Sequence, residues 1–142
     1  MNNFIENVSR ADILAGTHSD AGPNSMLIQI SGVVSEHPTP LKAFREIHQF
    51  NFEDIEEDEE WACTDDQATE LASLLRHAMN NHMNVIVHCH AGLCRSGAVV
   101  EAGILIGFNP PDRVRLPNTL VKNKLFKALG AQINESTSVW SS

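Results

Sequence analysis

Residues 87–96 of the chain read V-H-C-H-A-G-L-C-R-S, between an apolar run that ends near His88 and a run of small residues that begins at Gly97. A strand ending at His88 and a helix starting near Ser96 require a tight loop between them, and Gly92 allows the backbone to turn inward. The unpaired N–H groups at the start of the helix then point back into the loop. The sequence therefore predicts a strand–loop–helix unit whose loop binds an anion.

Two side chains of this loop fit a bound phosphate group. Arg95 can offer two parallel guanidinium contacts to phosphate oxygens, beside the converging backbone N–H groups. The same positive field favours the thiolate form of Cys89, which is the nucleophilic form of cysteine. A thiolate beside a bound phosphate indicates phosphoryl transfer to sulfur.

The spacing H-C-x-x-G-x-x-R-S resembles the signature loop of the cysteine-dependent protein tyrosine and dual-specificity phosphatases. Its fixed positions are His88, Cys89, Gly92, Arg95 and Ser96. Upstream, residues 52–55 (F-E-D-I) resemble the general-acid segment of short bacterial and phage members. Downstream, residues 116–118 (L-P-N) resemble a P-N element of the same proteins, so the resemblance covers the chain from about residue 25 onward.

The resemblance implies a phosphocysteine mechanism. Cys89 attacks phosphorus, Arg95 binds the equatorial oxygens in the transition state, and Ser96 donates to the sulfur when the thiolate leaves. Asp54 is the implied general acid for the leaving oxygen and then the general base for water. The other acids of the run Glu53–Glu60 are its rivals.

The rest of the loop is implied to bind phosphate through residues His90, Ala91, Gly92, Leu93, Cys94 and Arg95. In the family, the histidine at position 88 orders the loop and helps to keep the cysteine ionised. His90 faces either the substrate or the solvent. Cys94 replaces the usual serine of dual-specificity enzymes, so it is either a small packing residue or a redox partner that forms a protective disulfide with oxidised Cys89.

Hydrophobic periodicity predicts an α/β fold with a mainly parallel central sheet of about four to five strands flanked by helices. The expected strands are Met26–Ile30, Ile47–Phe52 and Asn84–His88. The expected helices are a short one over 10–14 after Ser9, one that a Thr64–Gln67 capping box begins and Asn80 ends, one from Gly97 to Ile106, and one that Asn118 caps. Ligands bind at the C-terminal ends of parallel strands, where Cys89 falls.

With 142 residues, of which 42% are hydrophobic, the chain fits a single domain spanning 1–142, with a tail from about residue 134 expected to fray. No apolar run approaches the roughly 20 residues of a membrane span, and no signal peptide begins the chain. A net charge of −8 argues against nucleic acid. We therefore expect a cytoplasmic monomer that acts on a phosphorylated protein or small phosphomonoester, without cofactor or metal.

The motif also allows several interpretations other than a cysteine-dependent phosphatase. A zinc site from residues 88, 89, 90 and 94 lacks the spacing of known sites. Arsenate reductases and low-molecular-weight phosphatases carry their loop near the N-terminus, and rhodanese loops lack the R-S ending. A phosphoinositide-directed member usually has extra basic residues inside the loop. The loop of this chain lacks such residues, which weakly favours a singly phosphorylated protein residue as the substrate. A non-catalytic phosphate-binding module is the remaining alternative.

Overall fold

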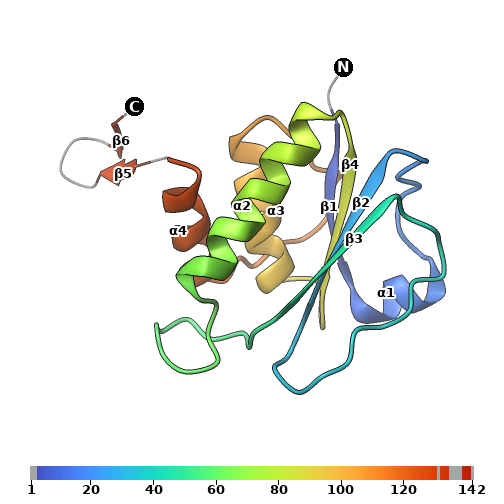
Figure 1. The fold of residues 1–142 in the computed structure, drawn as a ribbon, viewed down its shortest axis with the longest axis horizontal. Coiled ribbons are helices and arrows are strands. Elements are labelled where there is room, and N and C mark those ends of the chain that lie inside the picture. Colours follow the sequence, from blue (N-terminus) through green and yellow to red (C-terminus); the bar gives the residue numbers. More distant parts are fainter. Residues whose placement is uncertain (1–2, 131, 135–138, 142) are drawn as a thin grey trace.

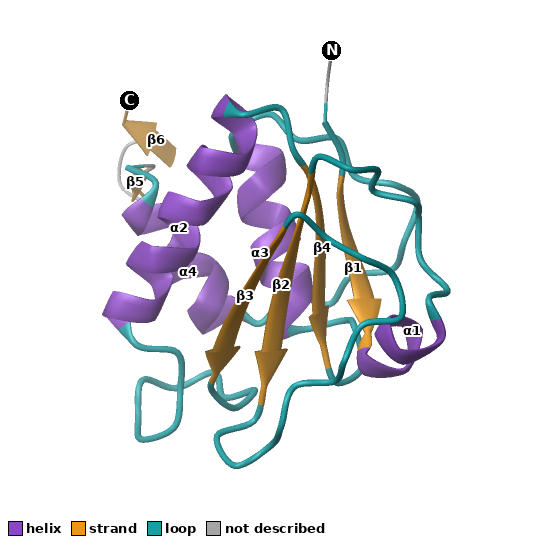
Figure 2. Ribbon diagram, turned by 45° about the vertical axis from the view of Figure 1, so that its right-hand side comes forward, coloured by secondary structure: helices purple, strands orange, loops and turns teal. Residues whose placement is uncertain are grey.

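Four parallel strands form the central sheet of the protein in a computed structural model that describes residues 3–130, 132–134 and 139–141. Their order across the sheet is β1-β4-β2-β3, so β4 lies inside the sheet. All four strands end at the same edge, the lower edge in Figure 2. The strands are β1 (Ile5–Ser9), β2 (Ser25–Ser31), β3 (Glu46–Asn51) and β4 (Asn84–Cys89).

Helices cover the two faces of the sheet unequally. Three helices pack on one face, and one short helix with long connections covers the other (Figures 1 and 2). The larger group is α2 (Asp65–Asn80), α3 (Arg95–Leu105) and α4 (Thr119–Ala128), and the short helix is α1 (Arg10–Ala15). The expected α/β fold with a parallel sheet of four to five strands is confirmed.

Alternation along β4 assigns its side chains to two cores. Val85, Val87 and Cys89 belong to the main core under α2, α3 and α4, whereas Ile86 belongs to the smaller core beneath α1. Burial on both faces explains the unbroken apolar run of this strand. The nucleophile candidate is therefore the last residue of a strand that lies inside the sheet.

Side-chain caps begin three helices where the sequence predicts them. Ser9 caps α1, Thr64 caps α2 through a capping box with Gln67, and Asn118 caps α4. α3 begins at Arg95, two residues before the expected start at Gly97. The signature loop is therefore two residues shorter than expected.

Strand β1 is absent from the sequence-based expectation, which placed no strand before residue 26. Two polar residues in it, Glu6 and Asn7, are each only 2% exposed. Glu6 pairs with Arg113, with 2.6 Å between Glu6 Oε2 and Arg113 Nε, and the Asn7 amide donates to Gly92 O at 2.8 Å. Hydrophobic periodicity does not detect a buried strand when some of its residues are polar and bind distant partners.

The C-terminal segment contributes a small antiparallel pair, β5 (Gln132–Asn134) and β6 (Val139–Ser141). Residues 135–138 and 142 of the tail that is expected to fray lie outside the described residues. Within the described part of the chain, no helix combines the length and apolar character that crossing a bilayer requires.

Candidate active site

The loop between β4 and α3 turns its backbone carbonyl groups outward. Four of its carbonyl oxygens accept hydrogen bonds from outside the loop, at 2.8 to 3.1 Å: His90 O from Arg10 N, Gly92 O from Asn7 Nδ2, Leu93 O from Leu116 N, and Cys94 O from Asn118 N. Among the described residues, the N–H groups of residues 91–94 have no acceptor. The loop therefore presents its N–H groups inward, in the arrangement that binds an anion.

Glycine is required at position 92. Its φ of 77° lies in the left-handed region. A Cβ atom there would also lie 2.5 Å from the carbonyl carbon of Val8 and 2.6 Å from the backbone nitrogen of Ser9. The loop packs directly on β1, which leaves no room for a side chain.

Cys89 and Ser96 meet at the base of the loop. The Cys89 sulfur lies 3.2 Å from the Ser96 hydroxyl oxygen, and the two residues are 2% and 0% exposed. A thiolate can only accept, so the Ser96 hydroxyl donates whenever Cys89 is ionised. The first-turn N–H groups of α3 direct their partial positive charge to the same place.

Arg95 spans the loop and the segment before the acidic run. Its Nη1 donates to Phe52 O at 2.8 Å, and its side chain is largely buried. Its Nε has no partner among the described residues. With Nη1 held by Phe52, the edge formed by Nε and Nη2 can bind two oxygens of one phosphate.

His88 lies on the opposite face of β4 from Cys89 and is 1% exposed. Burial lowers the pKa of His88 to about 4, and the positive charges of His37, Arg10 and Arg95 add to this effect. The neutral ring lies with Nδ1 3.3 Å from Cys89 O, so Nδ1–H donates to that carbonyl. His88 is thus hydrogen-bonded to the last peptide of β4.

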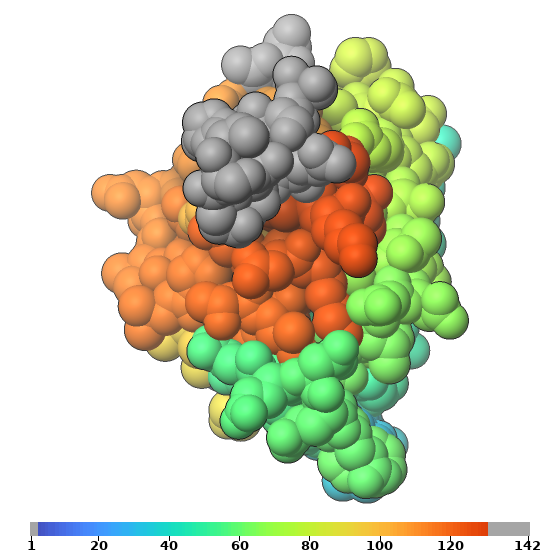
Figure 3. Space-filling view, turned by 90° about the vertical axis from the view of Figure 1, so that its left-hand side faces the viewer, coloured from blue at the N-terminus to red at the C-terminus, as the bar shows by residue number. Residues whose placement is uncertain are grey.

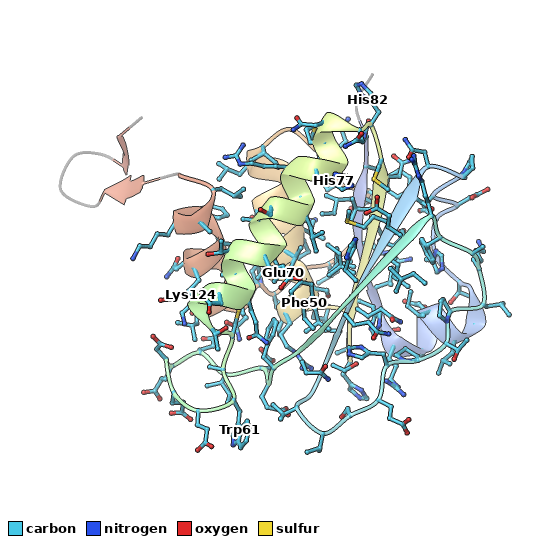
Figure 4. All side chains as sticks on the ribbon, viewed as in Figure 1. Phe50, Trp61, Glu70, His77, His82 and Lys124 are labelled. Carbon is cyan, nitrogen blue, oxygen red and sulfur yellow. The ribbon has the colours of Figure 1, made fainter. Side chains whose placement is uncertain are left out.

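The acidic segment forms a loop beside α4, visible as a green projection at the lower end of the face in Figure 3. Lys124 fixes the loop to α4, since its Nζ donates to Asp58 Oδ1 and to Cys63 O at 2.8 Å each. In Figure 4, Lys124 lies beside the end of this loop, where the chain enters α2, and Trp61 lies below it. The ion pair turns Asp58 toward α4, so it is a weak rival for the role of general acid.

Asp54 is held at the side of the signature loop. Its Oδ1 accepts a hydrogen bond of 2.7 Å from the Asn118 amide, and its carboxylate lies against Cys94. Burial and then the negative charge of Asp54 raise the pKa of Cys94. Cys94 therefore stays a thiol near neutral pH. Asp54 is exposed, and the neighbouring Glu53 is the acid that lines the cleft wall.

A cleft of about 600 Å³ opens over the nucleophile. The signature loop contributes residues 88–90 and 95 to its lining, and the β2–β3 connection contributes most of the opposite wall. Outside the signature loop, the lining consists of Arg10, Ile30, Ser31, Gly32, Ser35, Glu36 and Glu53.

Comparisons with known proteins found one family match and similar solved structures. Residues 47–108, a little under half of the chain, match a family described as a polymorphic toxin system, DSP-PTPase phosphatase. The resemblance to the dual-specificity phosphatase superfamily is thereby confirmed. Among solved structures, the fold is similar to that of OH1 from the Orf virus, a tyrosine phosphatase that displays distinct structural features and triple substrate specificity. The TM-score is 0.53 at 16% sequence identity, over 90% of this chain and 83% of that chain. No curated protein matches the chain.

The structure brings together most of the residues that the superfamily signature predicts for the site. Residues 88–96 form the end of β4, the loop after it and the start of α3, and Asn118 joins that loop to Asp54. Sequence reasoning missed Arg10 and the residues at the end of β2. Recognition of β1 would have found Arg10, because parallel strands end at a common edge of the sheet. Within the described residues, no group of three or more His, Cys, Asp or Glu side chains is placed to hold a metal ion.

Proposed function

We propose that the protein hydrolyses phosphate monoesters through a phosphocysteine intermediate on Cys89, as a phosphatase of the tyrosine or dual-specificity type. The observation that carries this proposal is the 3.2 Å contact between Cys89 Sγ and Ser96 Oγ, beside a loop in which four carbonyl groups accept hydrogen bonds from outside the loop. A sulfur buried at the focus of free N–H donors is suited to attack a bound dianion.

In the first step, the Cys89 thiolate forms a bond to phosphorus as the bond to the leaving oxygen breaks. Loop N–H groups and the free edge of Arg95 bind the three equatorial oxygens, where the charge is spread. Asp54 gives its proton to the leaving oxygen. The products of this step are the free alcohol or phenol and phosphocysteine.

In the second step, water attacks phosphorus as the bond to sulfur breaks. The Asp54 carboxylate takes the proton of the water, and the Ser96 hydroxyl donates a hydrogen bond to the departing thiolate while keeping its proton. Inorganic phosphate leaves and the thiolate is restored. Each residue thus returns to its starting protonation state after one turnover.

The proposed substrate is a phosphorylated protein residue or a small phosphomonoester. A catalytic thiolate needs reducing conditions, so the proposal includes a cytoplasmic location. It also includes a monomer that needs no metal and binds neither nucleic acid nor membrane, consistent with the net charge of −8.

Hydrolysis of an aryl phosphate, with reductant and a chelator, tests the proposal. We expect turnover in the wild type, inhibition by vanadate, and loss of turnover in Cys89→Ser. Asp54→Asn should lower the rate for a poor leaving group by roughly a hundredfold or more. Glu53→Gln is the matched control, because Glu53 is the adjacent acid and lines the cleft.

Three outcomes contradict parts of the proposal. Undiminished turnover in Cys89→Ser removes the phosphocysteine mechanism. A larger loss in Glu53→Gln than in Asp54→Asn assigns the acid to Glu53. Tight vanadate binding without turnover by the wild type identifies a phosphate-binding module instead of an enzyme.

A further inference from the structure

The cleft over Cys89 contains a second arginine that does not belong to the signature loop. Arg10 lines this cleft together with Arg95. Strand β1 delivers it: Ser9 is paired with Cys89 in the parallel register, and Arg10 N donates to His90 O at 3.1 Å. Neighbouring strands lie about 4.8 Å apart, so the backbone of Arg10 follows directly on the strand next to the one that ends at Cys89.

Most of the hydrogen-bonding capacity of Arg10 is unused. Its Nη1 donates to Glu36 O at 2.7 Å, and no other described residue binds the guanidinium. A guanidinium has five N–H donors, so four are available to a ligand. The bond to Glu36 O orients the group without neutralising its charge, because a backbone carbonyl is uncharged.

The two carboxylates of the cleft wall do not pair with Arg10. Glu53 Oε2 accepts from Val33 N at 2.7 Å, and a Cβ atom on Gly32 would lie 2.7 Å from the same oxygen. The Glu53 carboxylate is thus packed against the backbone at 32–33. Glu36 is exposed, and its carboxylate has no ion-pair partner among the described residues.

Arg10 and Arg95 act on one region of the cleft. After burial, which is the main cause, the charges of both arginines contribute to the lowered pKa of His88. The volume of about 600 Å³ falls in the range of pockets that enclose whole small-molecule ligands. The space beside the scissile phosphate is therefore large enough for another charged group, and Arg10 offers that group its unused donors.

We infer that Arg10 binds a second anionic group of the substrate, a phosphate or carboxylate close to the phosphate that Cys89 attacks. This inference rests on the proposed function and narrows its substrate class. It changes the expectation of a singly phosphorylated substrate, which came from the lack of basic residues inside the loop. The junction of β1 and α1 supplies the basic residue that the loop lacks.

Calorimetric binding to Cys89→Ser tests the inference without requiring turnover. One ligand pair is an aryl phosphate and the same ring with a second phosphate. The other pair is a singly and a doubly phosphorylated peptide of one sequence. We expect the second phosphate to tighten binding by about ten- to a hundredfold in at least one pair. Addition of Arg10→Gln should remove this gain and leave the affinity for the singly phosphorylated ligand unchanged.

Arg76→Gln is the matched control. Like Arg10, Arg76 donates a hydrogen bond from one guanidinium nitrogen to a backbone carbonyl, that of Leu129. Arg76 lies on α2, however, and is not among the cleft-lining residues. The gain from the second phosphate should persist in this variant.

The outcomes separate the sources of the anion. A gain with the ring alone identifies a small bisphosphate, and a gain with the peptide alone identifies a doubly phosphorylated protein segment; both support the role of Arg10. No gain in either pair, or a gain that survives Arg10→Gln, overturns the inference. Failure of the wild type to hydrolyse an aryl phosphate contradicts only the proposed function, because binding is measured in Cys89→Ser.

Discussion

At the scale of single residues, the proposed mechanism assigns to Ser96 the hydrogen bond to the sulfur as it leaves phosphorus. Its buried hydroxyl lies 3.2 Å from Cys89 Sγ. Hydrogen bonds to charged groups contribute about 1.5–3 kcal/mol. We predict that Ser96→Ala slows breakdown of phosphocysteine by about ten- to a hundredfold and leaves its formation less affected. Stopped-flow release of the phenol should therefore show a burst followed by a slow steady state.

Ser35→Ala serves as the control for this prediction. Ser35 lines the same cleft, but no described contact joins its hydroxyl to the sulfur. Its kinetics should resemble those of the wild type. A Ser96→Ala variant with no burst and a normal rate would show that the serine is only part of the helix start.

Cys94 gives a prediction that depends on pH. Burial and the Asp54 charge raise its pKa, so little thiolate is present near pH 7 to attack an oxidised Cys89. We predict that mild peroxide produces a Cys89–Cys94 disulfide faster at pH 8.5 than at pH 7. Asp54→Asn should speed the reaction at pH 7, because it removes the negative charge beside Cys94. Peptide mass spectrometry after rapid alkylation measures both effects.

Cys63 is an internal reference in the same experiment. It is fully buried, and burial raises its pKa to about 11, so it should stay unmodified. A Cys94→Ser variant should lose the disulfide and accumulate higher oxidation states of Cys89. Absence of the linkage at either pH would leave Cys94 as a packing residue.

At the scale of elements, Asn118 joins the signature loop, the acidic loop and α4. Its backbone N–H donates to Cys94 O, its amide donates to Asp54 Oδ1 at 2.7 Å, and its Oδ1 accepts from Val121 N at 3.0 Å. Serine caps a helix about as well as asparagine but lacks the amide donor. We predict that Asn118→Ser keeps the free energy of unfolding within about 1 kcal/mol and lowers kcat/KM roughly tenfold.

Thr64→Ala is the control variant, in which stability should fall and activity should not. It removes the side-chain cap of α2, which is worth about 1 kcal/mol, without removing a contact to Asp54. Urea unfolding and steady-state kinetics on both variants should therefore show a loss of activity in one and a loss of stability in the other. Equal activity in Asn118→Ser and wild type would mean that Asp54 needs no support from α4.

Elements whose signals are local could be predicted from the sequence. The capping box at Thr64 reflects contacts within a few residues along the chain. The apolar run of β4 and the glycine of the loop depend on distant neighbours, but their residue types alone mark them in the sequence. Strand β1 could not be predicted in this way, because Glu6 and Asn7 are satisfied by Arg113 and Gly92, more than 80 residues away. Because β1 was not predicted, the position of Arg10 at the site could not be predicted either.

At the scale of the whole molecule, the cleft depends on segments that the sheet brings to one edge. The signature could be recognised because all its members lie within nine residues. The opposite wall comes from the end of β2 and the connection after it, where Ser31 and Glu36 show no motif. Hydrogen bonds of the Asn51 amide to Gly32 O and Ser35 O hold this connection, and such long-range pairing leaves no mark in the sequence.

The ion pair of Glu6 with Arg113 joins β1 to the connection between α3 and α4. Glu6 is a carboxylate with 3% side-chain exposure, and Arg113 reaches it from the connection between α3 and α4. Removal of one partner from a buried ion pair costs about 3–5 kcal/mol, because the other charge is left buried and unpaired. Ser19 N still donates to Glu6 Oε1, so we predict a loss at the lower end, about 3 kcal/mol, for Arg113→Ala.

Arg115→Ala separates this effect from the general loss of an arginine. Arg115 lies two residues along the same connection and pairs with Glu101 at 2.8 Å, but both side chains are more than 20% exposed. Such a pair contributes about 1 kcal/mol or less. Urea unfolding at low ionic strength should show the difference, and equal losses would mean that water relieves the buried Glu6 charge. Because the same connection donates from Leu116 N to Leu93 O, a destabilised Arg113→Ala protein should also bind phosphate more weakly than Arg115→Ala.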